Sequence, residues 1–208
     1  MALVDEGPLL VGLTGNIATG KSTVARMLAE MGADYIDADK VAHRVMRPDQ
    51  AAYDVIVEAF GREVVSQDGT IDRGRLGALV FADREAMARL EAIVHPATVA
   101  AIDERIAESS ADVVVVEAIK LFEAGLADRC DSVWVTVCRR DQQIRRLVEG
   151  RDLSPDEARQ RVDAQRPQED RAELADVVID NSGSLTETRE QVIEAWNELV
   201  RGRGAGAG

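Results

Sequence analysis

Continuous runs of β-branched and other apolar residues recur along the chain and predict buried strands. Three such runs lie at 9–14, 112–117 and 132–137, and two shorter ones at 34–37 and 177–180. Strands that are apolar on both faces are typical of a parallel sheet that helices cover on each side. The pattern therefore predicts a central five-stranded parallel sheet.

Helical spacing of apolar residues separates most of these strands. Helices are predicted over 23–31, 38–46, 141–149 and 185–200. A further Arg-rich helix is expected to begin at Ser154, because Ser154, Pro155 and Glu157 combine an N-cap, a first-turn proline and a capping box. Strands that alternate with helices predict a three-layer, doubly wound α/β fold.

The stretch between 50 and 110 has little strand pattern and predicts a helical insertion after the second strand. Asp72 and Asp83 are good N-caps for helices over 72–81 and 83–94. Pro96, preceded by His95, is predicted to break or restart the second of these helices, which 98–108 would continue.

The residues from Gly15 to Ser22 fit G-x-x-x-x-G-K-[ST], the phosphate-binding loop, and lie between a predicted strand and a predicted helix. Glycines let backbone N–H groups turn toward a polyphosphate, and the helix N-terminus adds partial positive charge. Lys21 is expected to reach the β- and γ-phosphates, and the Ser22 hydroxyl to ligate Mg²⁺. The alternative is a glycine-rich turn before an ordinary helix. The predicted ATP-binding residues here are Gly15, Ala18, Thr19, Gly20, Lys21, Ser22 and Thr23.

The net charge of −13 changes the set of expected partners. It argues against nucleic acid and against anionic membranes, because both need basic surfaces. Residues 139–171 are different, with nine arginines against eight acidic residues. A local arginine cluster in an acidic protein suits a small anionic ligand.

The 208 residues suffice for one α/β domain with small insertions. No signal-peptide pattern and no apolar run of membrane-spanning length is visible, so we expect a cytoplasmic protein.

Cys130 and Cys138 are interpreted as free thiols, because a disulfide or a metal site would be unusual in a reducing cytosol. We expect a monomer or a weak homo-oligomer.

Polar residues follow the strands at the sheet edge where ligands of such folds bind. Asp37 and Asp39 come after the second strand, Glu117 and Lys120 after the third, and arginines including Arg146 after the fourth. Either Asp37 or Asp39 could be the N-cap of the next helix, and this capping role is favoured for Asp37.

Several of these segments together resemble the dephospho-CoA kinases. The matching segments are Gly12–Val24, Asp37-Ala38-Asp39 with Ala42-His43, His95-Pro96, Leu121–Leu126, Arg146-Leu147 with Arg151, and Ala175–Ser184. They occur in order over nearly the whole chain. The phosphate-binding loop alone would not distinguish among small-molecule kinases, but the ordered set is far more specific.

The resemblance implies phosphorylation of the 3′-hydroxyl of dephospho-CoA by ATP, giving CoA and ADP in the last step of coenzyme A biosynthesis. It implies a P-loop kinase core at 8–39 and 111–200, a helical CoA-binding insertion at about 40–110 and a small lid at about 150–170. By matched position Lys21 and Ser22 handle phosphate and Mg²⁺. Asp39 is the carboxylate at the acceptor hydroxyl, and Arg146 is the arginine near ATP. Lys21, Asp39 and Arg146 are thus the predicted catalytic residues.

The chain departs from the family pattern at two places. Asn16 replaces the second glycine of the usual Gly-Gly pair, and we expect the loop to survive because Asn tolerates left-handed backbone. Glu117 and Lys120 stand where Asp and Leu are usual. Lys120 could pair with Glu117 or Glu123, contact a substrate phosphate, or point to solvent.

Overall fold

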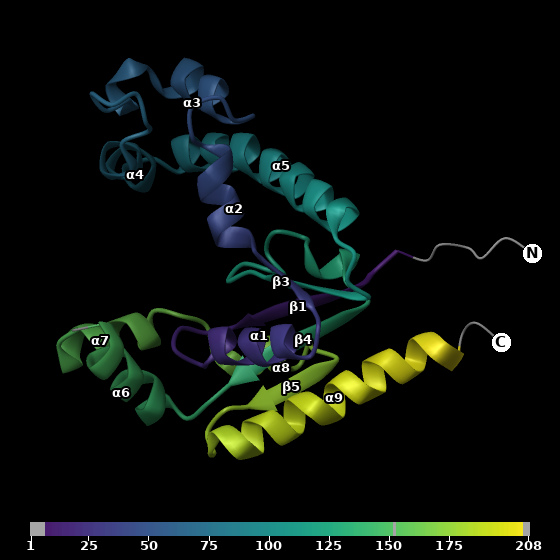
Figure 1. Cartoon of the computed structure of the whole chain (residues 1–208). Coiled ribbons are helices and arrows are strands. Elements are labelled where there is room, and N and C mark those ends of the chain that lie inside the picture. Colours follow the sequence, from purple (N-terminus) through teal and green to yellow (C-terminus); the bar gives the residue numbers. More distant parts are fainter. Residues whose placement is uncertain (1–6, 152, 206–208) are drawn as a thin grey trace, which may run out of the picture. The chain divides into compact units, whose positions relative to one another are not determined.

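A computed structural model describes residues 7–151 and 153–205. The chain forms two compact units (Figure 1). One consists of residues 36–108, and the other contains the described residues before and after that stretch.

The predicted five strands all form, in a single parallel sheet. They are β1 (Leu9–Gly15), β2 (Asp34–Asp37), β3 (Val113–Glu117), β4 (Ser132–Val137) and β5 (Val177–Asp180), in the order β2-β3-β1-β4-β5. Strand β1 pairs with β3 on one side and with β4 on the other, and β4 pairs with β5. This order places the residues that follow β1 at the middle of the sheet edge, where α/β folds bind ligands.

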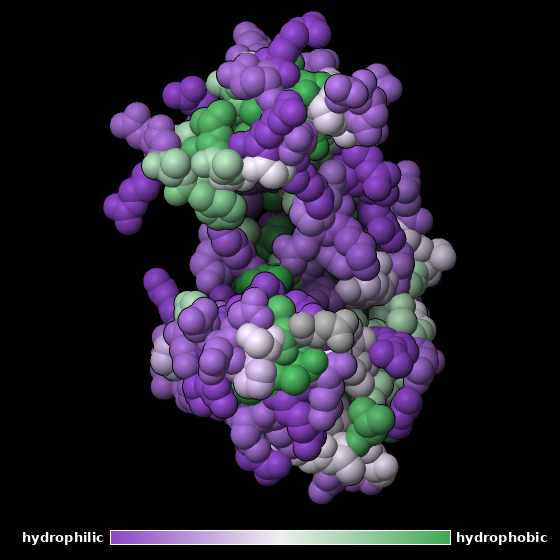
Figure 2. Space-filling view, turned by 90° about the vertical axis from the view of Figure 1, so that its left-hand side faces the viewer, coloured by the Kyte–Doolittle hydropathy of each residue, from purple (hydrophilic) through white to green (hydrophobic). Residues whose placement is uncertain are grey.

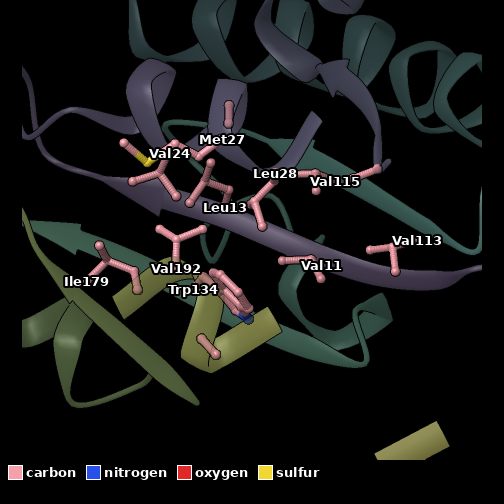
Figure 3. Close-up of a cluster of buried hydrophobic side chains, with 13 residues drawn as sticks. Val11, Leu13, Val24, Met27, Leu28, Val113, Val115, Trp134, Ile179 and Val192 are labelled. Carbon is pink, nitrogen blue, oxygen red and sulfur yellow. The ribbon is translucent and has the colours of Figure 1, made fainter. Parts of the chain in front are cut away.

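Helices α1 (Lys21–Glu30) and α9 (Leu185–Ala205) pack on one face of the sheet. Figure 3 shows Val24 and Leu28 of α1 and Val192 of α9 directed toward Leu13 and Trp134 of the strands. These five side chains are fully buried. Consecutive residues of β3, from Val113 to Val116, are all buried, so both faces of this strand are covered. Such strands are recognisable in a sequence as continuous apolar runs.

The Arg-rich segment contains α6 (Arg140–Arg151), α7 (Pro155–Asp163) and the short α8 (Gln168–Ala172). Of these three helices, only α8 was not predicted from the sequence. The capping box at Ser154 is present. Leu147, Ala158 and Val162 form a small buried cluster, against which Ile17 and Ala18 of the phosphate-binding loop pack. Helix α7 is therefore held by the apolar contacts of Ala158 and Val162 as well as by its capping box.

The other unit is helical, as predicted for the insertion. It contains α2 (Ala38–Val45), α3 (Tyr53–Phe60), the 3₁₀ turn η1 (Arg62–Val64), α4 (Arg73–Ala82) and α5 (Arg84–Glu108). Helix α5 packs against α2, α3 and α4. Asp37 and Asp72 cap α2 and α4 through hydrogen bonds from the backbone N–H groups of Lys40 and Arg75.

The predicted helix break at Pro96 is wrong. Helix α5 continues through this residue, with Pro96 in its interior. Proline removes the hydrogen bond that position 96 would make to the carbonyl of Ala92, and its ring crowds that carbonyl. Buried residues on both sides of the proline, Ala86 before it and Thr98 and Ile102 after it, hold the two halves in one helix. His95 therefore marks no helix end.

Helix α9 also extends beyond its predicted end at residue 200. Arg203 explains the extension, since its guanidinium donates hydrogen bonds to the carbonyls of Asp112 and Gly7 over 2.9 and 3.0 Å. None of the described helices is both long enough and apolar enough to span a membrane.

The helical unit exposes several large hydrophobic side chains. Val55, Leu79 and Phe81 are 46, 38 and 83% exposed. Figure 2 shows hydrophobic surface, in green, on this unit among mostly hydrophilic residues. Surface of this kind is available to a partly apolar ligand.

Candidate nucleotide-binding site

The phosphate-binding loop connects β1 to α1, as predicted. Its left-handed backbone positions are Gly15, Ala18 and Gly20, with φ of 150°, 59° and 98°. Asn16 is not among them, so the reason given for tolerating Asn there was wrong. Ala18 instead adopts the left-handed conformation, and its side chain packs against the α6–α7 cluster.

Lys21 lies at the start of α1 and turns back over the loop. Its Nζ donates hydrogen bonds to the carbonyls of Gly15 and Asn16 over 2.9 and 3.2 Å. The N-cap of α1 is Gly20, which has no side chain to cap the helix, and the first turn carries no acidic residue. The ammonium group and the N-terminal N–H groups of the helix thus create a site for an anion.

The second half of the loop is held by buried polar residues from three other elements. Thr19 Oγ1 lies 2.7 Å from Thr136 Oγ1 of β4, and Asn181 Nδ2 donates to the Thr19 carbonyl over 3.0 Å. Thr188 of α9 donates to Asn181 Oδ1 over 2.8 Å. Thr19 was predicted from the sequence as an ATP-binding residue, whereas no role was predicted for Thr136, Asn181 or Thr188. The position of Asn181 directly after a predicted strand was the available signal.

Arg146 of α6 contacts the phosphate-binding loop. Its Nη1 donates to the Ala18 carbonyl over 3.1 Å and its Nη2 to the Asn181 carbonyl over 2.8 Å. The structure therefore brings Lys21 and Arg146 to the same loop from different helices.

Ser22 is exposed in the first turn of α1. Mg²⁺ at phosphate-binding loops takes few protein oxygens and several from phosphate and water. A hydroxyl at the open end of α1 fits that donor set. Within the described part of the chain, no three His, Cys, Asp or Glu residues gather as a metal cluster.

Asp37 and Asp39 belong to the helical unit and differ in their contacts. Asp37 Oδ1 accepts a hydrogen bond from the Lys40 N–H, and its Oδ2 pairs with Lys40 Nζ over 2.9 Å. The capping role predicted for Asp37 is confirmed. Asp39 is exposed in the first turn of α2, where its carboxylate is accessible to a ligand.

His43 lies one helical turn after Asp39. Burial and the charge of Arg73 lower the pKa of His43, against the weaker opposite effect of Asp39 and Asp37. The imidazole is therefore neutral at pH 7. It does not supply a positive charge to the carboxylate of Asp39.

The two other carboxylates that the sequence singled out have defined partners. Glu117, at the end of β3, accepts a hydrogen bond from the Tyr35 hydroxyl over 2.5 Å. Glu123 pairs with Arg171 over 3.0 Å, and Lys120 is exposed. Although burial acts to raise it, the pKa of Glu123 is held below its usual value by a backbone hydrogen bond and by Arg171.

Cys130 and Cys138 are free thiols, as interpreted. Burial, assisted by Asp131, raises the pKa of Cys130 to about 11. Burial likewise raises the pKa of Cys138. Both thiols are protonated at neutral pH and are poor nucleophiles.

Gly20→Ala is expected to damage this site. A Cβ at this position would lie only 1.7 Å from Asn181 Nδ2, and φ is +98°. The substitution therefore adds backbone strain and displaces the Asn181 hydrogen bond to Thr19, which together should lower the free energy of unfolding by about 2 to 4 kcal/mol. Urea unfolding measures this change.

Gly32→Ala is the matched control. Gly32 has a similar φ of +102°, but its added Cβ would meet nothing within 4 Å. It should lose only about 1 to 2 kcal/mol from backbone strain. Equal losses in the two variants would contradict the claim that Asn181 closely packs against the loop.

A three-layer α/β fold with a phosphate-binding loop, an anion-binding helix start and loop-contacting lysine and arginine defines a P-loop kinase. A sequence model of the dephospho-CoA kinase family matches residues 9–187. The chain therefore belongs to the dephospho-CoA kinase family.

Individual relatives agree with this assignment. The chain is 46% identical over 195 residues to the dephospho-CoA kinase of Geobacter metallireducens, covering 92% of this chain and 97% of that protein. A solved Thermus thermophilus structure superposes with a TM-score of 0.82 at 33% identity, over 93% of this chain and 98% of that one. A Campylobacter jejuni dephospho-CoA kinase gives a TM-score of 0.69 at 29% identity over the same shares of the two chains.

Proposed function

We propose that this chain transfers the γ-phosphoryl group of ATP to the 3′-hydroxyl of dephospho-CoA, releasing CoA and ADP. The observation that carries the proposal is the phosphate-binding loop with Lys21 folded over it, in a chain whose family match spans nearly its whole length.

Lys21 has the central electrostatic role. In the described structure its ammonium contacts two loop carbonyls. A bound polyphosphate would supply stronger, anionic acceptors for the same group. Lys21 would then neutralise charge on the β- and γ-phosphates as the γ-phosphoryl group is transferred. Arg146, which donates to the Ala18 carbonyl, would support the loop close to that charge.

Mg²⁺, held by the Ser22 hydroxyl and phosphate oxygens, would neutralise charge on the transferring group when it is bound. Ser22 lies in the first turn of α1, one residue after Lys21. This position supports the assignment of its hydroxyl to the metal.

Asp39 is assigned to the acceptor hydroxyl. Its carboxylate would accept a hydrogen bond from the 3′-hydroxyl, orient that oxygen in line with the γ-phosphate, and take its proton late in the transfer. Two observations support this role: Asp39 is exposed in the first turn of α2, and the helix is capped by Asp37.

The helical unit is assigned to the remainder of dephospho-CoA. Exposed apolar side chains such as Val55 and Phe81 suit the partly apolar pantetheine arm. The residues at about 150–170 are assigned to a lid that closes on ATP and excludes water.

Lid closure should be visible by limited proteolysis. Arg159 and Arg161 are exposed on α7 and present trypsin sites. With a non-hydrolysable ATP analogue at about ten times its Kd, cleavage there should slow about tenfold, because the closed state is stabilised by ligand binding. Cleavage at Arg201, exposed on α9, is the control and should not change. An unchanged rate at 150–170 would argue against a nucleotide-driven lid.

An acceptor panel tests the proposed function itself. The purified protein is given Mg-ATP with dephospho-CoA, a nucleoside monophosphate or a small sugar acid, and ADP is measured. ADP formed only with dephospho-CoA supports the proposal. ADP formed with another acceptor would indicate a kinase of different specificity, and ADP formed without any acceptor an ATPase.

A further inference from the structure

Three hydrogen bonds join the first half of the phosphate-binding loop to residues 165–171, here named the anchoring segment. The Ile17 N–H donates to Gln165 Oε1 over 2.7 Å. Asn16 Nδ2 donates to the Arg166 carbonyl over 2.8 Å, and Arg171 Nη1 donates to Asn16 Oδ1 over 2.5 Å. Both polar atoms of the Asn16 side chain are thus used by the same segment.

Arg171 is fixed on two sides. Its side chain is only 13% exposed, and its Nη2 donates to Glu123 Oε1 over 3.0 Å. A guanidinium with a carboxylate on one branch and an amide oxygen on the other has a defined orientation, because its donors form a planar fork. Arg171 therefore presents a rigid contact to the loop.

Asn16 transmits this contact to the phosphate-binding atoms. It is 5% exposed, and its backbone carbonyl accepts hydrogen bonds from Lys21 Nζ and Thr19 Oγ1 over 3.2 and 2.9 Å. One residue thus joins Arg171 to the lysine that the proposed function assigns to the phosphates. A glycine at position 16 would keep the carbonyl contacts and lose both contacts to the anchoring segment.

We propose that Arg171 is a positioning residue for the phosphate-binding loop, and that it acts on bound nucleotide through Asn16 without touching the phosphates. The inference rests on the proposed nucleotide site. Holding Asn16 restricts the loop backbone before ATP arrives, so that less conformational entropy is lost when the phosphates bind.

A double-mutant cycle on nucleotide binding tests this inference. The variants are Asn16→Gly, Arg171→Gln and the double variant, and calorimetry measures the Kd of the magnesium complex of β,γ-imido-ATP. Each single variant should raise Kd about tenfold, the effect of one charge-assisted hydrogen bond. In the Asn16→Gly background, Arg171→Gln should raise Kd by less than about a further threefold. The reason is that the Asn16 side chain, through which Arg171 acts, is already absent.

If the Kd increases of the two single variants multiply in the double variant, the proposal is overturned. That result would indicate that Arg171 contacts the nucleotide directly. Unchanged affinity in Arg171→Gln would overturn it as well. If Arg171→Gln does not fold, Arg171→Lys replaces it, because this variant keeps the charge but not the planar fork. It should raise Kd in the wild-type background and much less in the Asn16→Gly background.

Arg189→Gln is the matched control for losing an arginine. Arg189 pairs with Glu30 over 2.8 Å on half-exposed surface, far from the loop in sequence, and its loss should leave Kd unchanged. Failure of the wild-type protein to bind the analogue would instead refute the proposed nucleotide site. The two failures are therefore distinguishable.

Discussion

Lys21→Ala is expected to lower turnover by about two to three orders of magnitude, because a group that stabilises charge in the transition state is worth about 3 to 4 kcal/mol. In the structure the ammonium of Lys21 donates hydrogen bonds to the loop carbonyls of Gly15 and Asn16. Its main effect should therefore fall on catalysis, with a change in unfolding free energy below about 1 kcal/mol. Steady-state turnover and urea unfolding measure the two effects separately.

Arg26→Ala provides the control for removing a cation from the same helix. Arg26 is exposed on α1, away from the helix start. Its loss should leave turnover within about twofold of wild type, as for most surface substitutions. Near-normal turnover in Lys21→Ala would remove the loop from the mechanism.

Asp39→Asn should lose about a hundredfold or more in turnover, because an amide oxygen cannot take the proton of the acceptor hydroxyl. Affinity for Mg-ATP should change little, since the carboxylate is assigned to the acceptor. Turnover at saturating dephospho-CoA and calorimetric ATP binding give the two quantities.

Asp37→Asn is the natural comparison, because the two residues are neighbours in sequence with different contacts. Asp37 caps α2 and pairs with Lys40. Asn is also a good N-cap, so this variant should lose far less turnover. If Asp37→Asn is the inactive variant, the two roles are reversed. Loss of Mg-ATP binding in Asp39→Asn would make Asp39 a metal-site carboxylate.

The strands and most helices could be predicted because their causes are local. Runs such as 113–116 are apolar on both faces, and caps such as Ser154 and Asp72 act within one turn. The helix break at Pro96 was predicted on the same local grounds and was wrong. Packing of buried residues on both sides of Pro96 outweighed the missing hydrogen bond and the crowding at the preceding turn.

The site was only partly predictable. Lys21 and Ser22 were predicted from a contiguous motif, and Arg146 was predicted from the family resemblance. In the structure Arg146 contacts the phosphate-binding loop. The contacts of Asn181 and Arg171 with the loop depend on residues more than a hundred positions away. No periodicity or spacing reports such a pairing, which only the folded chain creates.

Asn16 illustrates the difference between the two kinds of inference. The sequence identified it as a departure from a glycine and suggested a backbone explanation. The structure assigns it a different role, because its φ is not left-handed and its side chain binds Arg166 and Arg171. A substitution in a loop can therefore reflect a tertiary contact in place of a backbone requirement.

The most direct test of the account is product analysis with the wild-type protein. The protein is incubated with Mg-ATP and dephospho-CoA, and the products are identified by chromatography and ³¹P NMR. The account predicts ADP and CoA in equal amounts, with the new phosphate on the 3′-oxygen of the ribose. ADP released at the same rate without dephospho-CoA, or a phosphate at another position, would contradict it.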